Sequence, residues 1–237
     1  MVKLSDRMKA VADLVSPGNC VADIGCDHGY LPIYLVENEI APKAVAMDVR
    51  PGPLSAAKEN IHNAGLDDKI TTRLSDGLMK LERYEGESVI IAGMGGPLVI
   101  KILTQSKEFL GEDSQIKEFI LQPQSEQSYF RKNMRELGFI CEREDMIFED
   151  GKYYPMGRYV RGTQTEEIDF TLADEYGGLL LKQQNKVLMQ YLEKEKKTLE
   201  QIEKSLANMQ DGEEKEKRMK EVNEQKMRNK MARNFFN

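Results

Sequence analysis

Cysteine and histidine are scarce in this chain of 237 residues, which has three cysteines, two histidines and no tryptophan. The cysteines, Cys20, Cys26 and Cys141, are widely spaced, and no two of them form the C-x-x-C pair of a metal or redox site. This argues against a structural zinc site, and we expect no bound metal. An odd number of isolated thiols is typical of reduced cysteines, so we expect a cytoplasmic protein.

Long apolar runs are missing as well. No stretch of about 18 apolar residues, the length that crosses a membrane, occurs in the sequence. The N-terminus also lacks the apolar core and small-residue cleavage site of an export signal. With 40% hydrophobic and 31% charged residues, the sequence predicts a soluble, globular protein without a membrane-bound part.

Positive charge is in deficit, since the formal net charge is −6. By itself this argues against a nucleic-acid partner. The distribution is uneven, however: residues 1–181 carry 20 Lys and Arg against 30 Asp and Glu, whereas residues 182–237 carry 14 against 10. An acidic body with a basic arm leaves an RNA partner open.

The first 160 residues alternate short apolar runs with amphipathic stretches. The runs are rich in β-branched residues and end near Gly, Asp or Pro, which indicates strands over residues 20–24, 43–49, 69–75, 87–94 and 117–124. Helices are expected before and between them, over residues 4–15, 30–38, 53–63, 97–110 and 125–137. This order predicts right-handed crossovers and a parallel sheet.

Two further strands, 139–148 and 153–160, are joined by the turn EDGK. They predict an antiparallel edge strand on a mostly parallel, seven-stranded sheet. Such an edge is typical of class I (Rossmann-like) methyltransferases and is usually absent from nicotinamide-binding Rossmann domains.

The sequence pattern changes near residue 166: from there on, apolar residues follow a 4-3 spacing and charged residues occupy most other positions. The pattern predicts a first helix of about 28 residues after Gly178, a turn at DGEE (211–214), and a second helix to about Arg233. We therefore expect two domains: a catalytic domain over residues 1–163, and an antiparallel helical hairpin, packed as a coiled coil, over residues 164–237.

The strongest local motif is VADIGCDHGYLPIYL at 21–35, in which a strand, a turn with two glycines and a helix follow one another. Its Gly-x-x-x-Gly spacing differs from the Gly-x-Gly-x-x-Gly fingerprint of dinucleotide sites, which excludes an oxidoreductase of that type. A zwitterionic ligand with a sulfonium, such as S-adenosylmethionine, favours a nearby carboxylate, and Asp23 and Asp27 are placed to supply it.

Two more carboxylates follow strands. Asp48 ends the second strand, where it can accept both ribose hydroxyls of an adenosine. After the third strand, Asp76 can accept from the adenine amine while Leu78 packs on the ring; for each acidic residue a solvated strand end or a turn is the alternative interpretation. The fourth strand ends in IAGMGGP (91–97), whose glycines leave room for a flat target, without the Asn/Asp-Pro-Pro-aromatic loop of many amino-methylating enzymes.

Taken together, DIGCDHGYLP (23–32), LSDGL (74–78), IAGMGG (91–96), LQPQS (121–125) and the opening LSDRMKAVADLV (4–15) resemble the bacterial tRNA (adenine-N1)-methyltransferase family that modifies adenine 22, known as TrmK. The resemblance covers nearly the whole chain. It implies S-adenosylmethionine as methyl donor and tRNA as acceptor. The residues assigned to the cofactor are Gly25, Cys26, Asp27, Gly29, Asp48, Val49, Asp76, Gly77, Leu78 and Gly93.

Methylation of a ring nitrogen leaves a cation, which loses a proton from the exocyclic amine. We hypothesise that Asp27 or His28 accepts this proton or orients the base, although solvent can suffice. A loop role for His28, bonded to backbone, is the alternative. Tyr30 can stack on an extruded adenine or simply pack under the first helix, and Cys26 is better explained as a small filler than as a nucleophile.

The residues predicted to contact tRNA phosphates are cations: Arg7 near the mouth of the site, and Lys182, Lys186, Lys194 and Lys197 on the hairpin. An ordinary solvated helix face is the alternative for each lysine. We expect a monomer. Two other functions remain open: a methyltransferase for a small molecule or protein that uses the hairpin to oligomerise, and a non-catalytic nucleic-acid-binding protein on the same scaffold.

Overall fold

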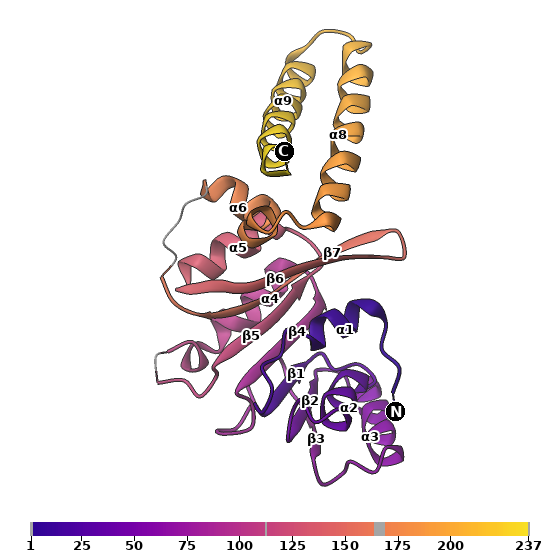
Figure 1. Ribbon diagram of the computed structural model, residues 1–237, viewed down its shortest axis with the longest axis vertical. Coiled ribbons are helices and arrows are strands. Elements are labelled where there is room, and N and C mark those ends of the chain that lie inside the picture. The colour runs from indigo at the N-terminus through magenta and orange to yellow at the C-terminus, as the bar shows by residue number, and fades with distance from the viewer. Residues whose placement is uncertain (1, 112, 164–168, 237) are drawn as a thin grey trace. The chain divides into compact units, whose positions relative to one another are not determined.

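The computed structural model describes residues 2–111, 113–163 and 169–236. It divides into two compact units, Met1–Thr165 and Glu166–Asn237. The predicted domain boundary at residue 164 lies outside the described residues. Both units are shown in Figure 1.

The first unit is built on a seven-stranded sheet in the order β3-β2-β1-β4-β5-β7-β6. The strands are β1 (Val21–Ile24), β2 (Ala44–Asp48), β3 (Ile70–Leu74), β4 (Ser88–Met94), β5 (Glu118–Pro123), β6 (Phe139–Glu149) and β7 (Lys152–Arg161). The first five are parallel to one another. Strand β7 runs antiparallel to both neighbours and lies between β5 and β6, so β6 forms the edge.

Helices cover both faces of this sheet. They are α1 (Asp6–Ala12), α2 (Tyr30–Glu37), α3 (Pro51–Asn63), α4 (Gly96–Gln105) and α5 (Gln127–Glu136). Helices α1, α2 and α3 contribute to one apolar cluster, and α4 and α5 to the other. Successive strand residues alternate between them, since Ile90 packs in the first cluster and Val89 and Ile91 in the second. The layered α/β fold predicted from the sequence is confirmed.

The largest differences from the predicted helix lengths are at α1 and α4, which are both shorter than expected. Helix α1 begins after Ser5, whose side chain accepts a hydrogen bond from the Met8 N–H and so fixes the start. Helix α4 ends at Gln105, and the predicted continuation becomes a separate 3-10 turn, η1 (Lys107–Phe109).

The second unit contains α6 (Phe170–Tyr176), α7 (Gly178–Lys182), α8 (Lys186–Ala207), α9 (Glu213–Arg233) and a final 3-10 turn, η2 (Asn234–Phe236). The predicted continuous helix after Gly178 is wrong, because the chain is interrupted between α7 and α8. Gln184 adopts a positive φ of 50° there, and the Asn185 side chain caps α8 by accepting from the N–H groups of Val187 and Leu188.

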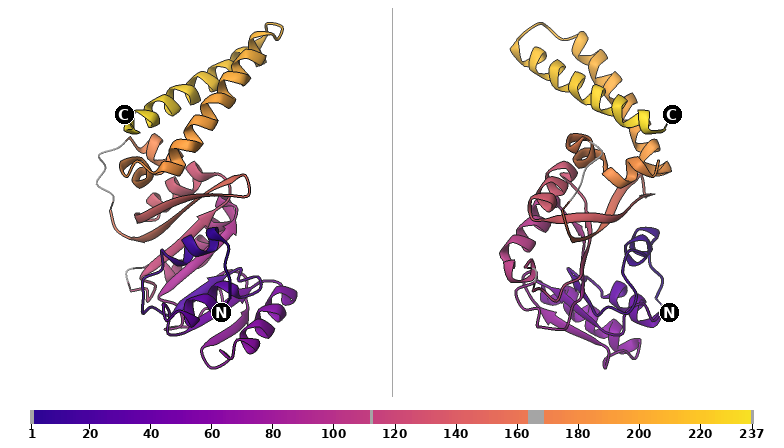
Figure 2. Two further views of the ribbon diagram at one scale, coloured as in Figure 1. Left: turned by 45° about the vertical axis from the view of Figure 1, so that its right-hand side comes forward. Right: turned by 60° about the vertical axis from the view of Figure 1, so that its left-hand side comes forward.

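Helices α8 and α9 lie side by side and run in opposite directions (Figures 1 and 2). Leu199, Leu206 and Val222 form their apolar contact. Ion pairs fix the pairing, with Lys226 Nζ 2.6 Å from Glu203 Oε2 and Arg233 Nε 2.8 Å from Glu193 Oε1. Coiled-coil packing in the strict sense stays a prediction.

Candidate active site

A cleft of about 630 Å³ opens at the carboxyl ends of the parallel strands of the first unit. This is the edge at which open α/β sheets bind ligands. Its lining comes mainly from the ends of β1, β2 and β4, from the loops after β1, β2 and β3, from α4 and from the N-terminal segment. The residues predicted for the cofactor that line it are Gly25, Cys26, Asp27, Asp48, Val49, Asp76, Gly77 and Gly93. The structure thus brings together residues that lie far apart in the sequence.

The turn after β1 requires glycine at Gly25. Its φ is +78°, and a Cβ atom there would overlap the side chain of Met94 at the end of the neighbouring strand β4. The Gly25 N–H donates to the Met47 carbonyl at 2.8 Å, which ties the turn to β2. The loop can therefore pass close to a ligand without a side chain in the way.

Gly29 and Leu78 are predicted cofactor residues that do not line the cleft. Gly29 begins α2 with φ +72°, and a Cβ there would lie 3.0 Å from Ala57 Cβ, so its smallness serves helix packing. Leu78 is fully buried in the cluster beneath α4. The apolar side chains that α4 gives to the cleft are instead Leu98 and Ile102. Sequence reasoning missed these two, although they follow the GMGG motif on one helix.

Asp23 and Asp48 are both buried, with exposed fractions of 5% and 4%. Burial, together with the negative charge of Asp48, raises the pKa of the Asp23 carboxyl to about 7. Asp48 Oδ1 accepts a hydrogen bond from the Arg50 N–H at 2.8 Å. Two carboxylates removed from water at one edge are costly unless a ligand or cation uses them, which marks this edge as functional.

Asp27 and His28 project from the strained part of the same loop. Asp27 has a positive φ of 48°, and its Oδ1 lies 3.9 Å from His28 Nε2. The His28 ring stacks on Tyr30, with centroids 5.6 Å apart and planes 18° from parallel. Asn60 Nδ2 donates to the His28 carbonyl at 2.9 Å, which holds the loop against α3.

The surroundings of Cys26 argue against a nucleophilic role for its thiol. Burial, followed by the charge of Asp23, raises the pKa of this thiol well above its ordinary value. A thiol that stays protonated is unreactive. The filler interpretation of Cys26 therefore fits its place in the turn.

The cleft wall formed by the N-terminal segment and the ends of β4 and β5 carries cationic and amide groups. Arg7 and Gln124 line it, and a Cβ on Gly93 would lie 3.8 Å from both Arg7 Nη1 and Gln124 Nε2. Arg7 was expected there; Gln124 was missed, although the LQPQ motif contains it.

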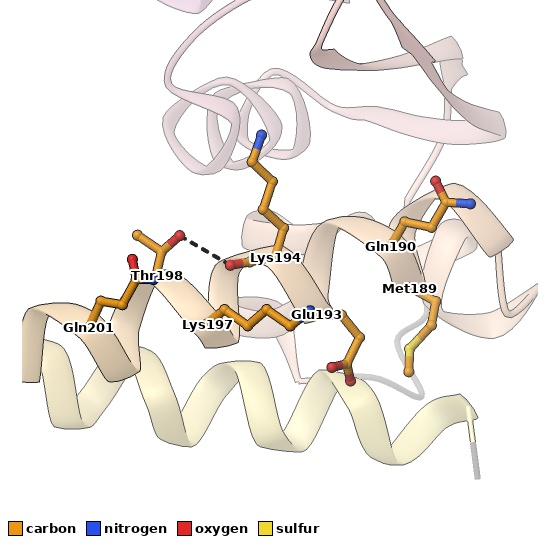
Figure 3. A pocket seen from close by; sticks show the side chains of 7 residues that line it. All are labelled: Met189, Gln190, Glu193, Lys194, Lys197, Thr198 and Gln201. Carbon is orange, nitrogen blue, oxygen red and sulfur yellow. Dashed lines mark hydrogen bonds between the residues drawn. The ribbon is translucent and has the colours of Figure 1, made fainter.

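The predicted tRNA-contacting lysines belong to the second unit, and all four are exposed there. Lys182 ends α7 and Lys186 begins α8. Lys194 and Lys197 line one hollow on α8 but point in different directions, and the Thr198 hydroxyl donates to the Lys194 carbonyl at 3.1 Å (Figure 3).

Across the described part of the chain, no helix is long and apolar enough to cross a membrane, and no group of three or more His, Cys, Asp or Glu could hold a metal ion.

The sequence matches the model of a methyltransferase domain over residues 4–156. It is also 31% identical, over 93% of both chains, to the tRNA (adenine(22)-N(1))-methyltransferase of Bacillus subtilis. This chain belongs to the TrmK family. The resemblance stated from DIGCDHGYLP and GMGG is thereby confirmed.

Solved structures of similar chains support the same family assignment. The crystal structure of B. subtilis TrmK matches with a TM-score of 0.87 at 30% identity, covering 98% of this chain and 99% of that one. M. capricolum TrmK, solved with S-adenosyl-homocysteine, matches with a TM-score of 0.83 at 26% identity over 99% of both chains. Streptococcus pneumoniae Sp1610, solved with S-adenosyl-L-methionine, matches at 0.84 and 29%, covering 97% and 99%. The predicted methyltransferase fold and the predicted cofactor, S-adenosylmethionine, are confirmed.

Proposed function

We propose that this chain transfers a methyl group from S-adenosylmethionine to N1 of adenine 22 in tRNA. The observation that carries the proposal is the cleft, which gathers the glycine turn, Asp48 and Asp76 at one sheet edge in a chain of the TrmK family. S-adenosylmethionine supplies an electrophilic methyl group, and the residues present fit it.

On the donor side, Asp48 is placed to accept from the ribose hydroxyls and Asp76 from the adenine amine. Asp23, or the exposed Asp27, faces the positive charge of the methionine part. The flat, open turn at Gly25 lets the ligand lie against backbone, while Leu98 and Ile102 supply apolar contact. These groups bind and orient the donor, and such positioning supplies several kcal/mol of a methyl-transfer barrier, on the order of 7–11 in the most favourable cases.

On the acceptor side, adenine N1 must be free of base pairing, so the base enters the cleft extruded or already unpaired. The wall with Arg7 and Gly93 faces it. After transfer, the exocyclic amine gives up a proton, and Asp27 and His28 are the groups in the cleft placed to accept it.

The second unit is proposed to hold tRNA through Lys182, Lys186, Lys194 and Lys197. Their exposure supports this, since phosphate contacts need cations that water and RNA can reach. We further propose that the enzyme works as a monomer in the cytoplasm, where its proposed substrate is found.

The test is mass-spectrometric mapping of methylated nucleosides in tRNA incubated with the protein and S-adenosylmethionine. We expect one new 1-methyladenosine, at position 22, in the wild type and in the control Asp68→Asn, an exposed carboxylate outside the cleft. Asp48→Asn is expected to lose the product at low donor concentration. Methylation of metabolites or proteins instead of tRNA would overturn the proposal.

A further inference from the structure

Gln122 in β5 is a fully buried polar residue that the assignments above do not use. Its Oε1 accepts two hydrogen bonds, from Arg7 Nη1 at 2.9 Å and from the Gly93 N–H at 3.2 Å. Its Nε2 donates to the Pro123 carbonyl at 3.3 Å. Both partners of Oε1 are donors only, so the orientation of the amide is fixed by chemistry.

This one side chain joins three segments: the opening helix α1, the end of β4, and β5. Arg7 is held by two further contacts. Its backbone N–H donates to Glu149 Oε1 at 3.1 Å, and its guanidinium lies over the Tyr154 ring, 5.4 Å from the centroid. The guanidinium is thus fixed in place while it lines the cleft.

The wall held by Gln122 differs in charge from the rest of the cleft. The carboxylates of the cleft lie at the ends of β1 and β2 and in the loops after β1 and β3: Asp23, Asp48, Asp27 and Asp76. The lining residues from the N-terminal segment and the ends of β4 and β5 are basic, polar or apolar: Lys3, Leu4, Ser5, Arg7, Met8, Ala92, Gly93, Met94 and Gln124. A fixed guanidinium on such a wall suits an anion, and Gly93 beside it leaves space for a flat base.

We propose that Gln122 is a positioning residue for the acceptor: it fixes the Arg7 guanidinium against a phosphate of the acceptor nucleotide and holds the Gly93 backbone back from the base. This rests on the proposed function. The arginine donates this hydrogen bond to a buried amide oxygen, and loss of either partner leaves a buried polar group unsatisfied and lowers the folding stability. The bond lies at the wall that is proposed to face the acceptor. Gln122 is buried and is not among the residues that line the cleft, so its role is one of positioning through Arg7 and Gly93.

The test compares Gln122→Met, which keeps the size of the side chain but removes the acceptor oxygen, with Arg7→Ala and with the double variant. Asn19→Ala is the control. Asn19 is also a buried amide, and its Nδ2 donates to the Ser88 hydroxyl at 2.9 Å, but it precedes β1 and so lies at the amino ends of the strands, away from the cleft. We measure kcat and KM for tRNA, the Kd for S-adenosylmethionine, and the melting temperature.

Q122M is expected to lower kcat/KM for tRNA by about 10- to 100-fold, as misplacement of about 1 Å does, and to leave the donor Kd within about twofold. Because much of the effect of Gln122 passes through Arg7, the double variant should lose clearly less kcat/KM than the product of the two single losses. N19A should lower the melting temperature without the loss in kcat/KM.

Losses in Q122M and R7A that multiply in the double variant would overturn the proposal, as would a Q122M loss no larger than that of N19A. If Q122M does not fold, Gln122→Asn, which retains the amide but withdraws the oxygen by one methylene, carries the same expectation. If wild-type protein methylates no tRNA, the proposed function fails; if the wild type is active and Q122M equals it, only the role of Gln122 fails.

Discussion

The two compact units of this chain differ in where their charged side chains lie. In the first, Asp23 and Asp48 are buried close enough for the charge of one to raise the pKa of the other. In the second, the charged side chains are mostly exposed or joined in ion pairs, such as Lys226 with Glu203 at 2.6 Å. A buried, mutually repelling pair lowers the free energy of unfolding, whereas exposed lysines cost almost nothing. Each buried carboxylate of the first unit can therefore be assigned to a site on its own evidence. The exposed lysines of the second unit can be assigned to one only as a group.

The sharpest test of this contrast is Asp48→Asn. Losing a buried, charged acceptor for the ribose should weaken S-adenosylmethionine binding by about 100-fold, or about 3 kcal/mol, the value of one or two hydrogen bonds to a charged group. The same change removes repulsion from Asp23, so the free protein should melt at a slightly higher temperature. Calorimetric titration and thermal melting measure the two effects.

The exposed Asp68→Asn serves as control for Asp48→Asn, and it should alter neither quantity. Unchanged donor affinity in Asp48→Asn would remove Asp48 from the site and with it the argument from burial.

The second unit is tested collectively, by replacing Lys182, Lys186, Lys194 and Lys197 with Gln in the full chain. We expect tRNA affinity to fall by about tenfold at physiological salt and the slope of log K against log salt to flatten by about three, close to the counterions that four phosphate contacts release. Donor affinity should stay constant. Binding measured between 50 and 300 mM salt gives the slope.

The matched control for the hairpin lysines replaces four exposed lysines of the first unit, Lys43, Lys58, Lys69 and Lys107. If both quadruple variants lose affinity and slope equally, net charge rather than the hairpin surface governs tRNA binding.

Much of the first unit could be predicted because its signals are local. Each strand is a short β-branched run that ends at Gly, Asp or Pro, and the predicted limits of β1 to β5 differ from the observed ones by a single residue at most ends. The glycine turn likewise depends on backbone freedom at Gly25 that only this residue type provides.

The predictions from the sequence are wrong or incomplete where the position of a residue depends on contacts with residues far away in the sequence. Leu78 follows a predicted site residue in the sequence, but packing under α4 buries it, while Leu98 and Ile102 reach the cleft because of how that helix faces the sheet. Gln122 lies in the LQPQS motif beside Gln124, but the motif does not show that its side chain is buried against Arg7. The role proposed for Gln122 depends on that contact, with a residue 115 positions away in the sequence. In the second unit the leucine spacing continues through Gln183–Asn185, so periodicity alone hid the break before α8.

A smaller effect is expected from pH. The Asp23 pKa of about 7 in the folded protein lies above the value of about 3.9 of an unfolded chain, so stability falls as pH rises from about 4 to about 7 and is level above that. If the Asp23 carboxylate pairs with the positive charge of the donor, binding releases its proton, and affinity should rise about five- to tenfold between pH 6 and 7.5. Titration at both pH values in buffers of different ionisation enthalpy measures affinity and proton release.

Asp23→Asn should abolish both the stability slope and the proton release. A pH-independent affinity in the wild type would instead assign the contact with the positive charge to Asp27.

The smallest effects are expected at Asp27 and His28, and they separate the remaining candidates for the proton acceptor. Asp27→Asn is the informative change, because asparagine tolerates the positive φ of 48° and removes the carboxylate without backbone strain. Both side chains are more than half exposed, so water can replace either one. Turnover at saturating donor should therefore fall only several-fold in Asp27→Asn or His28→Ala, below the roughly 100-fold that an enclosed general base supplies. A double variant that loses far more than the product of the single losses indicates that the two groups substitute for each other. Full turnover in all three variants would leave the proton to solvent and reduce the loop to a binding element.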